Sequence, residues 1–208
     1  MLYLNPKGKS NNDLDRNYWM DYNGKYEGII KNSTFSKIGG WITDEDGTSY
    51  LSLVSGASFE IPNFLPFEYD PTLKDVNNSS MGYGMTIELD FEISGVLDYD
   101  TELIKCISTT QSGDIQCGFT ITGERIKFYN SRLNGGIVGP LMDLSIIENK
   151  RIKFSFVIEP NDLKKTDDYP MCFAYLDGIL SGAVFYKDGD SYKDAINPAK
   201  LIINSTDA

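Results

Sequence analysis

The chain has 208 residues, of which 30 are Asp or Glu and 19 are Lys or Arg, so its formal net charge at pH 7 is -11. A surface this acidic repels phosphate backbones and anionic lipid surfaces, which argues against nucleic acid as a partner. The sequence contains no histidine. This excludes Ser-His-Asp and Cys-His catalytic sites and His-ligated zinc, and it leaves carboxylates as the acid–base pair available to an enzyme.

The composition indicates one β-rich globular domain. The 13 Tyr and 11 Phe, together with many Val, Ile and Thr, favour strands, and the 19 Gly and 8 Pro are scattered rather than gathered into a linker. The N-terminal apolar run is very short, and no other apolar stretch approaches membrane-spanning length. We therefore expect no signal peptide and no membrane insertion.

Residues 1–37 are expected to form an irregular N-terminal arm that precedes a domain at 38–208. We expect the aromatic residues Tyr18, Trp19 and Tyr22 to pack on the outside of the main core, with docking on a neighbouring subunit as the alternative. These three residues are therefore the candidates for an interface.

The first strands of the domain are expected at 40–43 and 48–53, joined by the acidic turn Asp44-Glu45-Asp46-Gly47. An acidic turn that ends in Gly is typical of a hairpin. The alternative is a Ca²⁺ ion held by the carboxylates of Asp44 and Asp46. No other cofactor is expected.

Residues 62–84 read as a long surface connection, and the remaining strands follow at regular spacing. We expect these strands at 85–93, 102–108, 117–122, 125–130, 151–158, 171–176, 179–186 and 201–204. Asp177-Gly178 lies between two apolar runs, which predicts a two-residue type I′ hairpin turn because both central positions need positive φ. The predicted class is all-β, with two antiparallel sheets forming a sandwich.

Two of these strands alternate strictly between apolar and charged residues. Glu88, Asp90 and Glu92 share one face of the first, and Arg151 and Lys153 share one face of the second. If the two strands are neighbours, cross-strand pairs of opposite charge each add up to ~1 kcal/mol and help to fix the register.

The three cysteines are odd in number, widely spaced and embedded in apolar patterns. This favours buried, reduced thiols for Cys106, Cys117 and Cys172. A disulfide between Cys106 and Cys117 across adjacent strands is the lesser alternative.

Specific residues give the chain a resemblance to a known family. It resembles the laminin-G-like, concanavalin A-like jelly rolls, in particular the variety found in structural proteins of bacteriophage tails and virions. The residues that carry the resemblance are Gly40-Trp41, Asp46-Gly47, Leu51-Ser52-Leu53, Gly56-Ala57, the segments 86–91 and 151–158, Tyr175-Leu176-Asp177-Gly178 and Ser181-Gly182.

The resemblance covers residues 38–204 and implies two antiparallel sheets of about six or seven strands each, one of them concave. In these relatives a final strand follows the segment that corresponds to 201–204. We therefore expect either a piece of a longer polypeptide or a domain whose edge a partner completes.

The enzyme hypothesis comes from concanavalin A-like glucanases, which carry Glu-x-Asp-x-Glu with the first Glu as nucleophile and the last as general acid–base. Glu88, Asp90 and Glu92 match this spacing residue for residue. However, Ser80-Met81-Gly82-Tyr83-Gly84 stands where those glucanases have Trp and Pro, and the non-catalytic relatives fit the segment 86–91 equally well. The resemblance therefore favours a non-catalytic protein.

A binding hypothesis places a glycan on Tyr129, Asn130, Arg132 and Asn134, although a plain polar loop after a strand is the alternative for these residues. The favoured interpretation, which rests on the resemblance, is a structural or interaction module of a virion that is made in the bacterial host cytoplasm. Its expected partners are other virion subunits, within an oligomer or a larger assembly, and a cell-surface glycan.

Overall fold

The computed structural model describes residues 2–54, 56–64, 69–74, 80–82, 85–92, 102–108, 115–122, 125–130, 137–143, 150–158, 170–185 and 199–205. Every regular element within these residues is a β-strand, and every strand pairing is antiparallel. The described part of the chain has no helix that is long and apolar enough to cross a membrane.

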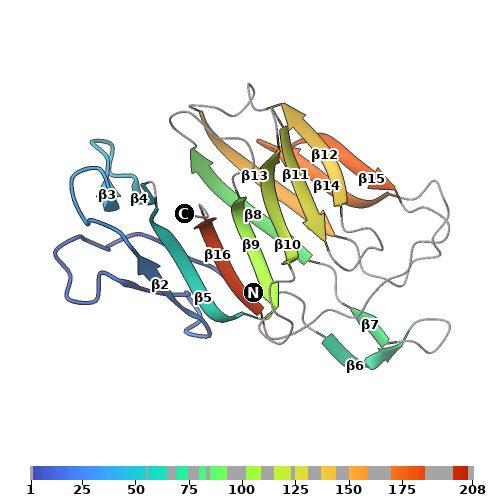
Figure 1. The fold of residues 1–208 in the computed structure, drawn as a ribbon, viewed down its shortest axis with the longest axis horizontal. Coiled ribbons are helices and arrows are strands. Elements are labelled where there is room, and N and C mark those ends of the chain that lie inside the picture. Colours follow the sequence, from blue (N-terminus) through green and yellow to red (C-terminus); the bar gives the residue numbers. More distant parts are fainter. Residues whose placement is uncertain are drawn as a thin grey trace.

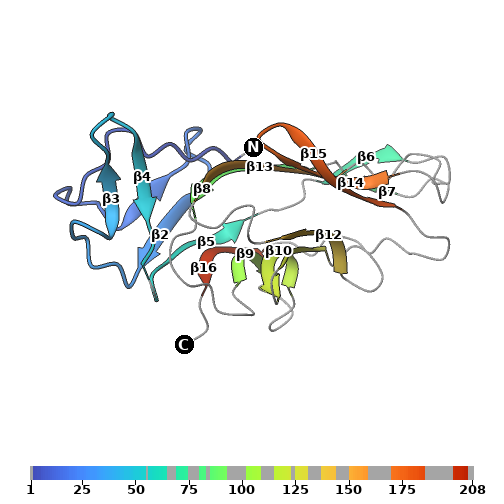
Figure 2. The same ribbon diagram turned by 90° about the horizontal axis from the view of Figure 1, so that it is seen from above.

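Two sheets face each other and form the body of the molecule (Figures 1 and 2). The larger sheet has the order β1 (Tyr18–Met20), β2 (Glu27–Lys31), β5 (Ser58–Phe64), β16 (Ala199–Ser205), β9 (Glu102–Ser108), β10 (Ile115–Thr122), β11 (Arg125–Asn130) and β12 (Ile137–Asp143). The smaller sheet has the order β15 (Ile179–Phe185), β14 (Pro170–Leu176), β13 (Arg151–Ile158) and β8 (Met85–Glu92). The expected all-β, two-sheet antiparallel sandwich is confirmed.

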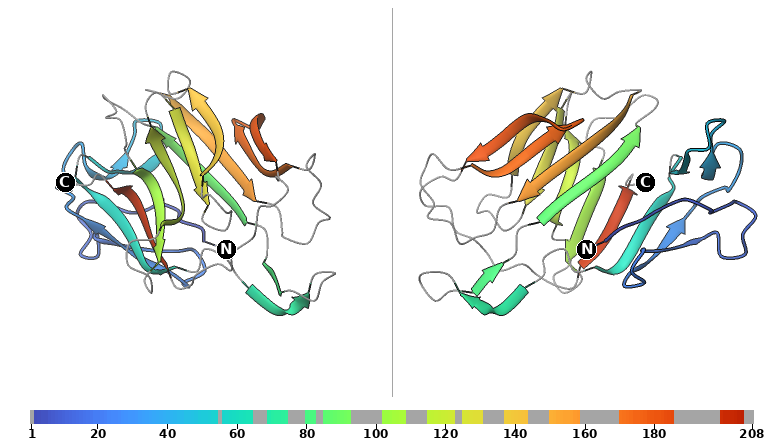
Figure 3. Two further views of the ribbon diagram at one scale, coloured as in Figure 1. Left: turned by 45° about the vertical axis from the view of Figure 1, so that its right-hand side comes forward. Right: turned by 180° about the vertical axis from the view of Figure 1, so that it is seen from behind.

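Two further ribbons accompany the sheets. The hairpin of β3 (Gly40–Thr43) and β4 (Ser49–Ser52) lies beside the sandwich at the end that also holds β2, and β6 (Tyr69–Lys74) pairs with β7 (Ser80–Gly82) at the periphery (Figures 1 and 3). The connection expected at 62–84 therefore contains strands, because β5 continues to Phe64 and β6 and β7 follow it.

The inner faces of the two sheets supply the core. On the larger sheet, Phe59 and Ile61 are fully buried and Leu201 is 4% exposed. On the smaller sheet, Ile152 and Phe154 of β13 are buried, while Arg151 and Lys153, which alternate with them along the strand, are exposed. This alternation is the two-residue period of a strand that is dry on one face and wet on the other.

Two short strands lie in the N-terminal segment, residues 1–37, which the sequence predicted to be an irregular arm. Its strands β1 and β2 extend the larger sheet beyond β5, with Trp19 directly opposite Gly28. The Trp19 ring meets the Trp41 ring edge-on, with centroids 4.9 Å apart, and lies 5.4 Å from the Phe59 ring. Trp19 is 9% exposed, so its large apolar surface is covered within the chain, and its part in an interface stays a prediction.

Hydrogen bonds fix this N-terminal segment against the domain. The Trp19 Nε1–H donates to the Asn5 carbonyl (3.2 Å), and the Trp41 Nε1–H donates to the Arg16 carbonyl (2.8 Å). The buried Asp21 accepts the backbone N–H of Tyr26 (2.7 Å), which closes the turn between β1 and β2. Tyr18 and Tyr22 remain 44% and 77% exposed, and both stay interface candidates.

The hairpin turn predicted at Asp177-Gly178 is confirmed. The two residues have φ values of 48° and 80° and join β14 to β15, as a type I′ turn requires. The last strand, β16, lies inside the larger sheet between β5 and β9 rather than at its edge. The expected final strand and the domain boundary at residue 38 stay predictions.

Gly28 leaves the space that the Phe59 ring occupies, since a Cβ built on Gly28 would overlap that ring. Because Phe59 is fully buried and cannot move without opening the core, Gly28→Ala is expected to lower the free energy of unfolding by about 1–3 kcal/mol. Urea unfolding followed by tryptophan fluorescence measures the change. Glu27→Ala, an exposed substitution on the same strand, is the control and should stay within about 0.5 kcal/mol of the wild type. Equal stability of the two variants would contradict the packing described.

Candidate functional site

The acidic row predicted on β8 lies on the outer face of the smaller sheet. The right-hand view of Figure 3, which is turned by 180° from Figure 1, has this sheet in front. Glu88, Asp90 and Glu92 are all exposed. In the register of the two strands, Glu92 faces Arg151, Asp90 faces Lys153 and Glu88 faces Ser155. The expectation that the acidic and basic strands are neighbours is confirmed.

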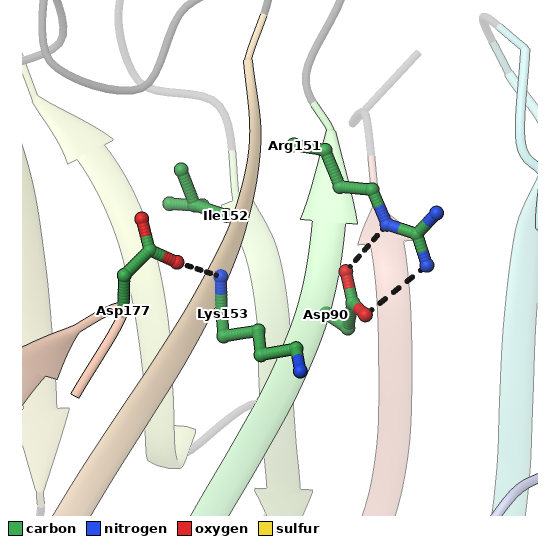
Figure 4. Close-up of a pocket in the computed structure, with 5 residues that line it drawn as sticks. All are labelled: Asp90, Arg151, Ile152, Lys153 and Asp177. Atoms are coloured by element: carbon green, nitrogen blue, oxygen red, sulfur yellow. Dashed lines mark hydrogen bonds and ion pairs between the residues drawn. The ribbon is translucent and has the colours of Figure 1, made fainter.

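Arg151 makes the central contact of this face. Its Nε and one terminal nitrogen donate to the two carboxylate oxygens of Asp90, at 2.8 and 3.1 Å (Figure 4). The pair is diagonal, since the residue directly opposite Arg151 is Glu92. Hydrogen bonding from Arg151 lowers the pKa of Asp90 against an opposing effect of burial, and the charges of Arg151 and Lys153 lower it further. Asp90 in turn raises the pKa of Arg151.

The turn between β14 and β15 is fastened to the same face. The Asp177 N–H donates to the Lys153 carbonyl (2.8 Å), and the Lys153 N–H donates to Asp177 Oδ1 (2.9 Å). Asp90, Arg151, Ile152, Lys153 and Asp177 line an open hollow of about 370 Å³ (Figure 4). The carboxylates of Asp90 and Asp177 are thus both held by hydrogen bonds.

The β3–β4 hairpin brings a second set of acids to the end of this face. The charges of Asp46 and Asp44 contribute to the raised pKa of Arg151, after the effects of Asp90. Burial raises the pKa of Tyr50, and a hydrogen bond with Asp44 and the charges of Asp44 and Glu92 raise it further. Sequence reasoning missed this association, because only the tertiary fold brings the hairpin to Arg151.

Calcium ligation by Asp44 and Asp46 stays a prediction. Hydrogen bonds from the backbone and side chain of Thr48 lower the pKa of Asp46, and the Thr48 N–H lies 2.9 Å from Asp46 Oδ1. Ca²⁺ takes about six to eight oxygen ligands. Among the described residues no group of three or more His, Cys, Asp or Glu is arranged to hold a metal ion.

Two of the glycan candidates belong to the larger sheet. Tyr129 and Asn130 are the last residues of β11, where Tyr129 faces Gly118 and Asn130 faces Cys117. Arg132 and Asn134 lie outside the described residues. Tyr129 and Asn130 therefore lie on a different sheet from the charged face of β8 and β13.

The backbone of β8 bears on the enzyme hypothesis. Retaining glycoside hydrolysis needs two carboxyl groups about 5–5.5 Å apart, whereas positions i and i+4 of a straight strand are ~13 Å apart at Cα. The pairing of β8 with β13 runs without a register shift from Met85 opposite Ile158 to Glu92 opposite Arg151. No bulge along these paired residues brings Glu88 and Glu92 closer, and Asp90 between them is already paired with a cation.

Comparison with known proteins adds little to this description. No family model matches the chain, and no curated protein matches it. A solved structure of the alginate lyase AlgAT5 from polysaccharide lyase family 7 is similar over 90% of this chain and 79% of that chain, with 12% sequence identity and a TM-score of 0.34. A likeness of this extent bears on neither the site nor the activity. The strands and their pairing define this chain as an all-β, two-sheet antiparallel sandwich with a charged outer face.

Asp90→Asn is expected to remove a pH-dependent contribution to stability. The pKa of Asp90 is lowered in the folded protein, so its contribution is present above the ordinary carboxyl pKa of about 3.9 and is lost as the pH falls through the lowered folded-state pKa. Since Asp90 is 40% exposed, solvent screening limits the effect at pH 7 to about 1 kcal/mol or less.

Urea unfolding of the wild type and the variant at pH 7 and at about pH 2 measures this contribution. Glu88→Gln is the matched control, because Glu88 lies on the same strand and face but opposite Ser155. The stability gap should shrink in acid for Asp90→Asn alone. An identical pH response of both variants would show that pairing with Arg151 contributes nothing specific.

Proposed function

We propose that this chain is a non-catalytic structural and interaction module, a component of a bacteriophage virion such as a tail, fibre or head decoration protein. The observation that carries the non-catalytic part is the bidentate pairing of Asp90 with Arg151 on a regular, exposed sheet face. The central carboxylate of the Glu-x-Asp-x-Glu pattern thereby serves to join two strands. The virion part is supported by the resemblance of residues 38–204 to the jelly rolls of phage structural proteins.

Two surfaces are proposed to meet partners. The first is the outer face of the smaller sheet, where Arg151, Lys153 and Asp177 surround an open hollow. The second is the N-terminal edge of the larger sheet, where Tyr18 and Tyr22 are exposed. Tyrosines supply large contact areas at small entropic cost, which suits them to binding other subunits.

Carbohydrate binding is the second part of the proposal. Tyr129, Asn130, Arg132 and Asn134 are the residues proposed to contact a cell-surface glycan, since amide, guanidinium and hydroxyl groups together offer both donors and acceptors to sugar hydroxyls. The alternative function is retaining hydrolysis of a β-glucan by Glu88 and Glu92. The match in spacing and the position of both residues on one exposed face favour it.

A reducing-end assay with soluble β-glucans separates the two functions. The wild type, Glu88→Gln and Glu92→Gln are all expected to release product at the rate of a no-protein blank, because the two glutamates are spaced along a straight strand. Release by the wild type that disappears in Glu88→Gln, with folding unchanged by circular dichroism, would overturn the non-catalytic proposal.

Glycan binding and virion location need separate measurements. On a glycan array, the wild type should give a signal that falls by about tenfold or more in Tyr129→Ala, since an aromatic platform is lost. Tyr22→Ala is the control, because Tyr22 is an exposed tyrosine in the turn between β1 and β2. Antibody labelling of phage particles released from a host that carries the gene should place the chain on the particle. Its recovery only in the soluble fraction of the lysate would refute the virion assignment.

A further inference from the structure

Two of the three cysteines of the chain are direct partners in the larger sheet. Cys106 on β9 faces Cys117 on β10 in the antiparallel pairing of these strands. On their other sides, Cys106 faces Leu201 of β16 and Cys117 faces Asn130 of β11. The sequence raised a cross-strand disulfide as the lesser alternative to free thiols, and the strand register now supplies its main geometric requirement.

That requirement is the separation of the two Cα atoms. Residues that face each other in an antiparallel pair have Cα atoms about 4.5 or 5.5 Å apart, depending on the hydrogen-bonding pattern. Disulfides span Cα separations of about 4.4–6.8 Å. Both values for a facing pair fall within this range, so the Cα separation at these positions meets the requirement for a disulfide.

The fold also specifies the pairing. Cys172 lies on β14 in the smaller sheet, where it faces Ile158 of β13 and Val184 of β15. No cysteine faces Cys172 among the described residues, so the folded chain offers one facing pair and one separate thiol.

We propose that Cys106 and Cys117 form a reversible intrachain disulfide, while Cys172 keeps its thiol. The oxidant is a small-molecule disulfide such as oxidised glutathione. One cysteine thiolate attacks it, forms a mixed disulfide and releases one glutathione thiolate. The second cysteine thiolate then attacks the mixed disulfide, forms the Cys106–Cys117 bond and releases the second glutathione. The protein loses two electrons and two protons, and the two protons end on the two glutathione thiols.

The bond would secure the register of β9 and β10. Their pairing shifts register between Ile115 and Cys117 and again between Phe119 and Thr120, and at such irregularities the hydrogen-bond ladder is locally disrupted. A covalent tie at Cys117 would hold the alignment between the two shifts. The disulfide is independent of whether the chain binds glycans or belongs to a virion.

The test is equilibration of the purified chain in glutathione buffers of graded redox ratio. After acid quench and alkylation, peptide mass spectrometry should identify a Cys106–Cys117 link with alkylated Cys172, and the intact mass before alkylation should fall by about 2 Da because two hydrogens leave. Cys172→Ser should retain the link, and Cys106→Ser and Cys117→Ser should each abolish it.

A denatured control shows whether the fold directs the bond. In the native chain, half of the Cys106–Cys117 pair should be oxidised at a ratio of reduced to oxidised glutathione at least about tenfold higher than in denaturing urea. The reason is that the paired strands hold the two cysteines together. Three alkylated cysteines at every ratio, a link that contains Cys172, or equal midpoints in native buffer and urea would each overturn the proposal.

Discussion

The uninterrupted pairing of β8 with β13 is the constraint on which both the smaller sheet and the candidate site depend. On the inner face of the two strands, Ile152 and Phe154 are buried in the core. On the outer face, Arg151 donates two hydrogen bonds to Asp90. A slip of one residue would turn the buried side chains toward water and the charges into the core. The apolar and ionic contacts therefore specify the same register, and the ion pair adds specificity more than stability because it is partly exposed.

A second constraint acts at the other end of the molecule, where three aromatic rings join separate parts of the chain. Trp19 of β1, Trp41 of β3 and Phe59 of β5 pack together, and this packing makes the N-terminal segment part of the larger sheet. The same segment is tied on the sheet surface by Lys31, whose ammonium lies 2.6 Å from Glu60 Oε2. Because the β3–β4 hairpin takes part in this cluster through Trp41, the cluster also positions Asp44, Asp46 and Tyr50 beside the charged face.

Features with a local signature could be predicted from the sequence. The alternation in β8 and β13 predicted an apolar face and a charged face for each strand. Asp177-Gly178 predicted a hairpin turn, and the structure confirms its positive φ values. The partners of Trp19 could not be predicted, because nothing in a three-residue strand distinguishes a buried aromatic from an exposed one until its neighbours in the fold are known. The influence of Asp44 and Asp46 on Arg151 had no sequence signal for the same reason, since burial and long-range charge effects arise only from tertiary packing.

The position of β8 at the edge of the smaller sheet has a consequence for crowded conditions. An edge strand offers unpaired backbone groups to any extended chain nearby and can start aggregation. Here the edge carries Glu88 and Glu92 on either side of Asp90, whose charge is balanced by Arg151, so two copies that approached through this edge would bring like charges together. The acidic row can thus keep neighbouring copies from fusing their sheets, at a site where an apolar edge would be a hazard.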